Sequence, residues 1–150
     1  MTYTINSDSN ITIQSSSPNG LTLNTSTILE SSQLTYTPNN AGSKIIYDYS
    51  FLVHMDTPDS DICFIKLQEH DGSSWVDVGN CVKSLGNTKQ LSQVASIKFI
   101  IDSWSGSKQL RLYCEAKGSS HDILLYTNYY WYGASAQNNK YKCILKVSEV

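Results

Sequence analysis

Turn-forming residues recur along the whole chain and leave only short runs of strand-forming residues between them. Examples are the segment 38–42, which is rich in Asn and Gly, and the pairs Asp71-Gly72 and Ser105-Gly106. Strands are therefore expected at about residues 2–6, 10–14, 20–24, 33–37, 44–54, 61–69, 74–82, 95–103, 108–116, 122–132 and 141–149. Runs this short and closely spaced leave little room for long helices.

The segment 108–116 shows a two-residue alternation most clearly. Leu110, Leu112 and Cys114 fall on one face of an extended strand, whereas Arg111 and Glu115 fall on the other. No comparable stretch has a sustained 3.6-residue apolar period, apart from one possible turn of helix at 89–94. The pattern predicts an all-β fold.

Two hairpins are expected from the turn chemistry. Asp71-Gly72 tolerates the positive φ of a tight turn and would join the strands at 61–69 and 74–82, and Ser105-Gly106 would join the strands at 95–103 and 108–116. About ten short strands without a repeat of propeller-blade length favour an antiparallel β-sandwich of the jelly-roll type. The length of 150 residues suits one domain, 1–150, in which the more polar residues 1–30 form edge strands or an arm toward a neighbouring subunit.

Charge and hydropathy argue against several classes of partner. Only 16% of the residues are charged, the net charge is -2, and Arg111 is the single arginine. A chain without a basic run offers no footprint for phosphate backbones or anionic lipid, so neither nucleic acid nor a membrane is expected as a partner. The N-terminus has no secretory pattern, and we expect a soluble protein made in the cytoplasm.

Four widely separated cysteines, Cys63, Cys81, Cys114 and Cys143, exclude CxxC metal knuckles. Cys114 alternates with Leu110 and Leu112, and Cys143 lies between Tyr141 and Leu145, as small core residues do. We therefore expect free thiols and no disulfide.

Catalytic and metal-binding signals are sparse. His54, His70 and His121 have no second histidine at ligand spacing, no serine lies in a G-x-S-x-G turn, and the expectation is a protein without enzyme activity or cofactor. Asp56, Asp59 and Asp61 form an incomplete set of oxygen ligands for calcium, and a solvated acidic loop explains them equally. Trp75 and Trp104 flank the two turns and are interpreted as packing residues.

Aromatic residues concentrate at 126–132, where Tyr129, Tyr130, Trp131 and Tyr132 follow one another. On a strand these rings occupy both faces, although one sandwich core needs only one such face. The second set either packs under a loop or meets another subunit or a sugar. These four residues are the predicted interface or ligand site.

The hairpin DGSSWVDVG at Asp71–Gly79, the segment WSGSKQLRLYCEA at Trp104–Ala116 and the closing strand YKCILKVSEV at Tyr141–Val150 resemble surface proteins of tailed bacteriophages and related double-stranded DNA viruses. In those families, jelly-roll domains similar to the heads of tumour necrosis factor and complement C1q serve as capsid decoration, fibre or knob proteins. The resemblance implies a non-enzymatic virion structural protein on the virion surface, made in the host cytoplasm. It also implies a homo-oligomer, with a trimer favoured, and as partners a major capsid protein and host-surface glycans. The alternative is a carbohydrate-binding module or lectin.

Overall fold

The computed structural model describes residues 3–6, 10–14, 21–23, 26–29, 31–55, 61–87, 91–116, 123–125 and 143–150. These residues form twelve β-strands and no helix. The strands are β1 (Tyr3–Asn6), β2 (Asn10–Gln14), β3 (Leu21–Leu23), β4 (Thr27–Ile28), β5 (Leu34–Thr37), β6 (Lys44–Met55), β7 (Asp61–His70), β8 (Trp75–Asn87), β9 (Leu91–Asp102), β10 (Lys108–Ala116), β11 (Ile123–Leu125) and β12 (Ile144–Glu149). The all-β prediction is confirmed.

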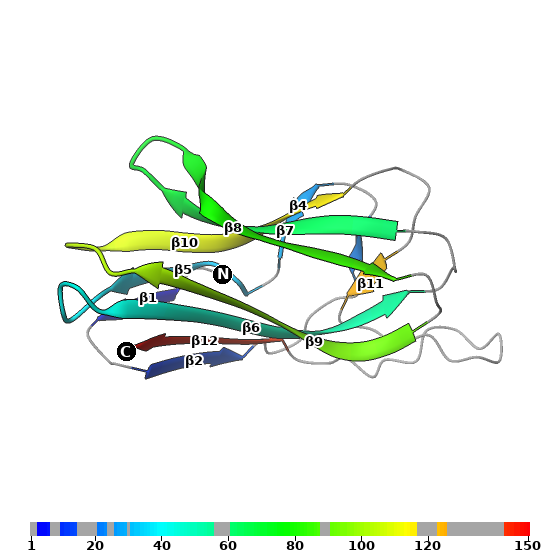
Figure 1. Cartoon of the computed structure of the whole chain (residues 1–150), viewed down its shortest axis with the longest axis horizontal. Helices are drawn as coiled ribbons and strands as arrows, with labels where there is room; N and C mark the ends of the chain where they lie inside the picture. Colours follow the sequence, from blue (N-terminus) through cyan, green and yellow to red (C-terminus); the bar gives the residue numbers. More distant parts are fainter. Residues whose placement is uncertain are drawn as a thin grey trace.

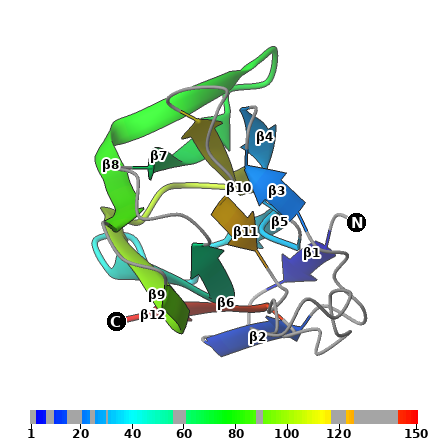
Figure 2. The same ribbon diagram turned by 90° about the vertical axis from the view of Figure 1, so that its right-hand side faces the viewer.

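The strands form two sheets packed as a sandwich (Figure 1). Sheet A has the order β1-β5-β10-β7-β8, with β4 also paired to β10, and sheet B has the order β2-β12-β6-β11-β3, with β9 on the other edge of β6. Figure 2 looks along the sandwich and shows β8 and β9 on one side and β1 on the other. All pairs are antiparallel except β1 and β5, which are parallel.

Each sheet contains a run of four paired strands, β5-β10-β7-β8 in sheet A and β2-β12-β6-β9 in sheet B. Within this set of eight strands, the chain changes sheet at every connection except the β7–β8 hairpin. Such alternation between two four-stranded sheets is the jelly-roll arrangement, so that prediction is confirmed as well.

The turn at Ser105-Gly106 does not close a hairpin, which corrects the sequence-based expectation. β9 pairs with β6 in sheet B, whereas β10 pairs with β5 and β7 in sheet A. Gly106, with φ +79°, therefore lies in a turn that carries the chain from one sheet to the other. A turn-forming pair of residues indicates where the chain reverses direction. Which strands then pair depends on other strands that are distant in the sequence.

The helical turn suggested at 89–94 is also wrong for its described part. Residues from Leu91 onward belong to β9, and Val94 pairs with Leu52 of β6. The twelve-residue ladder between β6 and β9 outweighs the local preference, because alternate residues of β9 gain backbone hydrogen bonds to β6 along the whole strand. The apolar pattern that suggested a helix at 89–94 covers only one helical turn.

The core lies between the sheets and includes alternate residues of β5, β6, β7, β9, β10 and β12. Leu110, Leu112 and Cys114 are fully buried, which confirms the alternation read at 108–116. β6 contributes Ile45, Tyr47, Tyr49 and Phe51 from the opposite sheet. Trp104 is half-buried against this core, as its interpretation as a packing residue requires.

All four cysteines are free thiols, as expected, and Cys63, Cys114 and Cys143 are buried. Cys63 lies on β7 next to β10, and a hydrogen bond with it, together with burial, raises the pKa of the Cys114 thiol far above its ordinary range. The Cys114 thiol therefore stays protonated at neutral pH.

We expect a reducing agent to leave the thermal stability unchanged, because no described cysteine pair is covalently bonded. The measurement is the unfolding temperature with and without excess dithiothreitol. A decrease of more than about 10 °C would contradict this result, since the loss of a native disulfide costs roughly 2–5 kcal/mol and a domain of this size loses a few degrees per kcal/mol.

Candidate functional site

Most residues singled out in the sequence lie outside the residues that the structure describes. This holds for Tyr129, Tyr130, Trp131 and Tyr132, for Asp56 and Asp59, and for His121. Asp61 begins β7 and His54 is near the end of β6, but neither side chain is described. Among the described residues there is no group of three His, Cys, Asp or Glu residues that could hold a metal ion.

Three connections meet at one end of the sandwich: the β5–β6 loop, the β7–β8 turn and the β9–β10 turn (Figure 1, left). In the β7–β8 turn, the Asp71 carboxylate accepts bonds from the backbone N–H groups of Ser73 and Ser74, both at 2.8 Å. These bonds lower the pKa of Asp71 strongly. Gly72 supplies the positive φ of +104° that was expected at this turn.

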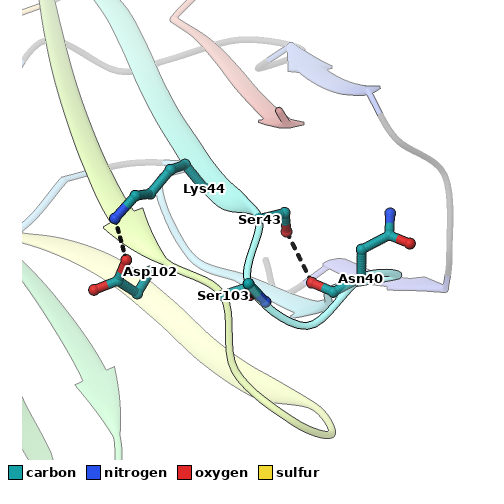
Figure 3. Close-up of polar contacts among 6 residues, drawn as sticks. Asn40, Ser43, Lys44, Asp102 and Ser103 are labelled. Atoms are coloured by element: carbon teal, nitrogen blue, oxygen red, sulfur yellow. Dashed lines mark hydrogen bonds and ion pairs between the residues drawn. The ribbon is translucent and has the colours of Figure 1, made fainter.

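The β5–β6 loop is tied to the last strand by a carboxylate. Glu149 of β12 accepts bonds from the Ser43 hydroxyl at 2.6 Å, the Asn40 N–H at 2.7 Å and the Asn39 N–H at 2.8 Å. The Ser43 hydroxyl also donates to the Asn40 carbonyl oxygen at 2.9 Å, and the ion pair of Lys44 with Asp102 ties the next residue to β9 (Figure 3). This end of the sandwich is therefore well ordered by polar contacts.

We expect Glu149 to make the protein less stable in acid. The Ser43 hydroxyl and the two loop N–H groups hold the pKa of Glu149 below its ordinary value of 4.5. Its contribution is thus complete above about pH 4.5 and is lost as the pH falls through the folded-state pKa. In Glu149→Gln, the unfolding temperature should be lower at neutral pH and fall less steeply toward about pH 3. Parallel curves for the two proteins would contradict this assignment, and Ser43→Ala, which keeps the carboxylate, should give an intermediate slope.

Two adjoining hollows open at the same end. One has a volume of about 620 Å³ and is lined by polar groups that include Thr35, Ser105 and Ser107. The other, of about 450 Å³, is lined by Trp104 and by residues of β8 and β9. Both are lined by Glu69 and Lys108, whose ion pair measures 2.8 Å. The Lys108 Nζ also lies 5.6 Å from the Trp104 ring centroid, so both Glu69 and the Trp104 ring hold this cation in place.

The outer face of sheet A carries an aromatic and cationic cluster beside the larger hollow. The Arg111 guanidinium carbon of β10 lies 4.1 Å from the ring centroid of Trp75, the first residue of β8. The ring of His70, the last residue of β7, meets Trp75 edge-to-face at 5.2 Å. We call Trp75, Arg111 and His70 the Trp75 cluster.

A polar network supports this cluster from the neighbouring strands. Gln68 accepts from the Arg111 Nε at 2.9 Å and donates to Asp77 at 2.9 Å. Lys66 pairs with Asp77 at 3.3 Å and with Glu115 at 2.7 Å. Lys66 thus pairs with both described carboxylates of this network, and Arg111 forms no ion pair with a carboxylate among the described residues.

The outer face of sheet B has a different character. Ile100, with 60% of its surface exposed, pairs with Ile46, and Val94, 54% exposed, pairs with Leu52. Between these two apolar groups lies a charged row in which Lys98 reaches Asp48 at 3.5 Å. Ile100 and Val94 are among the most exposed aliphatic side chains of the described residues.

Sequence reasoning did not identify the Trp75 cluster. The sequence alone favours a packing role for Trp75, shows no second histidine at ligand spacing for His70, and places Arg111, the single arginine, on the outward face of its strand. Register brings them together: Arg111 pairs with Gln68, Gln68 with Asp77, and His70 with Trp75. A lone arginine on the polar face of an alternating strand was the only local signal.

The protein matches no family model and no curated protein sequence. Among solved structures, it is similar to the C-terminal domain of EclA, described as a sugar-binding protein, with 17% identity over 81% of this chain and 77% of that chain and a TM-score of 0.37. It is also similar to the structure of the Gx strain of infectious bursal disease virus, with 12% identity over 94% of this chain and 38% of that chain and a TM-score of 0.37. Likenesses of this extent assign no family.

The described part of the chain contains no apolar helix of the length that a bilayer crossing requires.

Proposed function

We propose that the protein is a non-enzymatic structural protein of a virion surface, acting as a capsid decoration or fibre/knob protein through homo-oligomeric assembly. The observation that carries this proposal is the outer face of sheet B, where Ile100 and Val94 are more than half exposed. Complete burial of both would add about 1–2 kcal/mol per subunit before the cost of association. A second copy of the chain, held in a closed symmetric oligomer, would remove this surface from water.

The remaining parts of the proposal rest on the sequence resemblance. These are the trimeric state, a major capsid protein as partner, and synthesis in the host cytoplasm before incorporation into the particle. The Tyr129–Tyr132 segment remains a proposed contributor to the interface. Purified particles examined by mass spectrometry should contain the chain, and its absence from them would overturn the virion assignment.

Sedimentation at micromolar concentration tests the assembly itself. The wild-type protein should sediment as a closed oligomer, and the pair Val94→Glu and Ile100→Glu should sediment as a monomer of unchanged fold. The matched control is Val82→Glu with Ile28→Glu, which introduces the same charges at exposed aliphatic positions of sheet A. A wild-type monomer, or equal dissociation in the control, would exclude sheet B as the interface.

A second candidate function is carbohydrate binding, which the larger hollow favours. Thr35, Ser105 and Ser107 present hydroxyl groups in it, and His70 connects it to the Trp75 ring. Polar rims beside an aromatic ring suit sugars, whose ring faces are apolar and whose edges are hydroxylated. A glycan array with and without chelator tests this function and the calcium role of Asp56, Asp59 and Asp61 together. Chelator-sensitive binding would support calcium, and no binding to any glycan would exclude the candidate.

A further inference from the structure

We propose that the Trp75 cluster is a binding site for a carboxylate-bearing saccharide, with Arg111 receiving the carboxylate and His70 donating to a neighbouring oxygen of the sugar. This proposal deepens the carbohydrate-binding candidate and rests on it. It is independent of the assembly proposed for sheet B, because the cluster lies on the outer face of sheet A.

Arg111 is held in one orientation with its terminal amino groups unused. Its Nε donates to Gln68 at 2.9 Å, and its guanidinium carbon lies 4.1 Å from the Trp75 ring centroid. Gln68 is itself fixed, because its amide nitrogen donates to Asp77. Neither Nη group has a hydrogen bond or ion pair within the described residues. A guanidinium oriented in this way presents the paired donors that match the two oxygens of a carboxylate.

Burial at this position does not neutralise the arginine. It lowers the pKa of Arg111, but a guanidinium remains charged at every physiological pH. Partial desolvation strengthens its attraction for an incoming anion, because fewer water molecules compete for the same donors. The acidic side chains of the supporting network, Asp77 and Glu115, are paired with Lys66 and not with Arg111, so the cation of Arg111 is available to a ligand.

His70 adds a second oriented donor beside the same ring. Its Nδ1 accepts the backbone N–H of Gly72 at 3.1 Å, so the neutral imidazole carries its proton on Nε2. This Nε2–H has no partner among the described residues. The His70 ring centroid lies 5.2 Å from the Trp75 ring centroid, and the guanidinium carbon of Arg111 lies 4.1 Å from the same Trp75 centroid. Two donors therefore flank one aromatic ring.

The surroundings favour a saccharide over an acidic peptide. His70 also lines the hollow of about 620 Å³, in which Ser105, Ser107 and Thr35 offer hydroxyl groups to further sugar residues. A glutamate or aspartate side chain would engage Arg111 but would not fill this polar hollow, which Glu69, Asp71 and Lys108 also line. The ligand that uses both features carries a carboxylate and several hydroxyl groups, as a uronic or sialic acid does.

Titration calorimetry with two matched ligand pairs tests the proposal. The pairs are tri-galacturonate with its methyl ester, and sialyllactose with lactose, so that each pair differs in the carboxylate. At least one acidic member should bind, at least about tenfold more tightly than its neutral counterpart, because a charge-assisted bond contributes about that factor. Poly-glutamate, which has the carboxylates without the sugar, should bind more weakly.

Variants distinguish binding at the Trp75 cluster from nonspecific electrostatic attraction of the ligand to the protein. Arg111→Gln should weaken binding of the acidic sugar at least about tenfold. Arg111→Lys keeps the charge but loses the fork and should lose much of the affinity as well. Lys146→Gln removes the same charge from the outer face of sheet B and should have no effect. The fold of each variant is checked by its unfolding temperature, and Arg111→Lys carries the test if the glutamine variant does not fold.

Several outcomes would overturn the proposal. One is equal binding of acidic and neutral sugars, which would leave sugar binding intact but remove the role of Arg111. Others are equal losses in Arg111→Gln and Lys146→Gln, tighter binding of poly-glutamate, and no binding of any of these ligands. The last result would also weaken the carbohydrate candidate, whereas none of these results bears on the sedimentation of the oligomer.

Discussion

Leu110→Ala is expected to destabilise the protein by about 3 kcal/mol, which is a large part of the stability of a domain of this size. The Leu110 side chain is fully buried, and its strand β10 is paired on both edges, with Leu34 of β5 opposite one side and Glu69 of β7 opposite the other. The cavity left by alanine would lie against a strand that is paired on both edges, so the surrounding chain cannot move in to fill it. The loss of stability therefore includes both the lost apolar burial and the lost packing contacts.

Urea denaturation of Leu110→Ala measures this loss, and the neighbouring substitution Gln109→Ala is the control. Gln109 is half-exposed on the opposite face of the same strand, and its replacement should change the free energy of unfolding by less than about 0.5 kcal/mol. The unfolding temperature of Leu110→Ala should fall by roughly 6–12 °C. Similar losses in both variants would mean that the inward face of β10 is not the one described.

Ser32→Ala should cost about 2 kcal/mol, although it removes a single oxygen atom. Along one edge of β10 the ladder is interrupted, since β5 pairs as far as Leu110 and β4 pairs from Tyr113. Ser32 fills this gap: its hydroxyl accepts from the Leu112 N–H at 3.1 Å and donates to the Leu29 carbonyl oxygen at 2.7 Å. Ser32 is fully buried, so alanine would leave the Leu112 N–H in the core without a partner or water.

The exposed serine Ser96 is the matched control for Ser32. Its hydroxyl bonds Asp48 at 2.7 Å on the outer face of sheet B, where water can replace it, and Ser96→Ala should change stability by less than about 0.5 kcal/mol. Hydrogen exchange gives a second measurement, because the Leu112 amide should lose protection in Ser32→Ala. Unchanged exchange at Leu112, together with a loss below about 0.5 kcal/mol, would refute the role assigned to Ser32.

Ser32 also shows why part of this structure escapes prediction from the sequence. It follows Ser31 in a polar stretch and carries no local sign of burial. Its position in the core depends on Leu112, eighty residues later in the chain, and on the Tyr47 hydroxyl, which donates to its carbonyl oxygen. The Trp75 cluster depends in the same way on three strands that meet only after the sheet has formed.

The sequence by itself determined the secondary structure of the long strands, including β6, β7 and β10, and the inward face of β10. This was possible because turn residues and a two-residue apolar period act between residues that are close together in the sequence. The sequence therefore contains all the information that these signals need. It also sufficed for the all-β class and the jelly-roll expectation. The tertiary structure alone decided that β9 and β10 join different sheets, that residues 91–94 extend a strand, that β1 runs parallel to β5, and that Arg111 reaches Trp75. These features depend on which distant edges complete their hydrogen bonds, and that choice is made by the free energy of the whole fold.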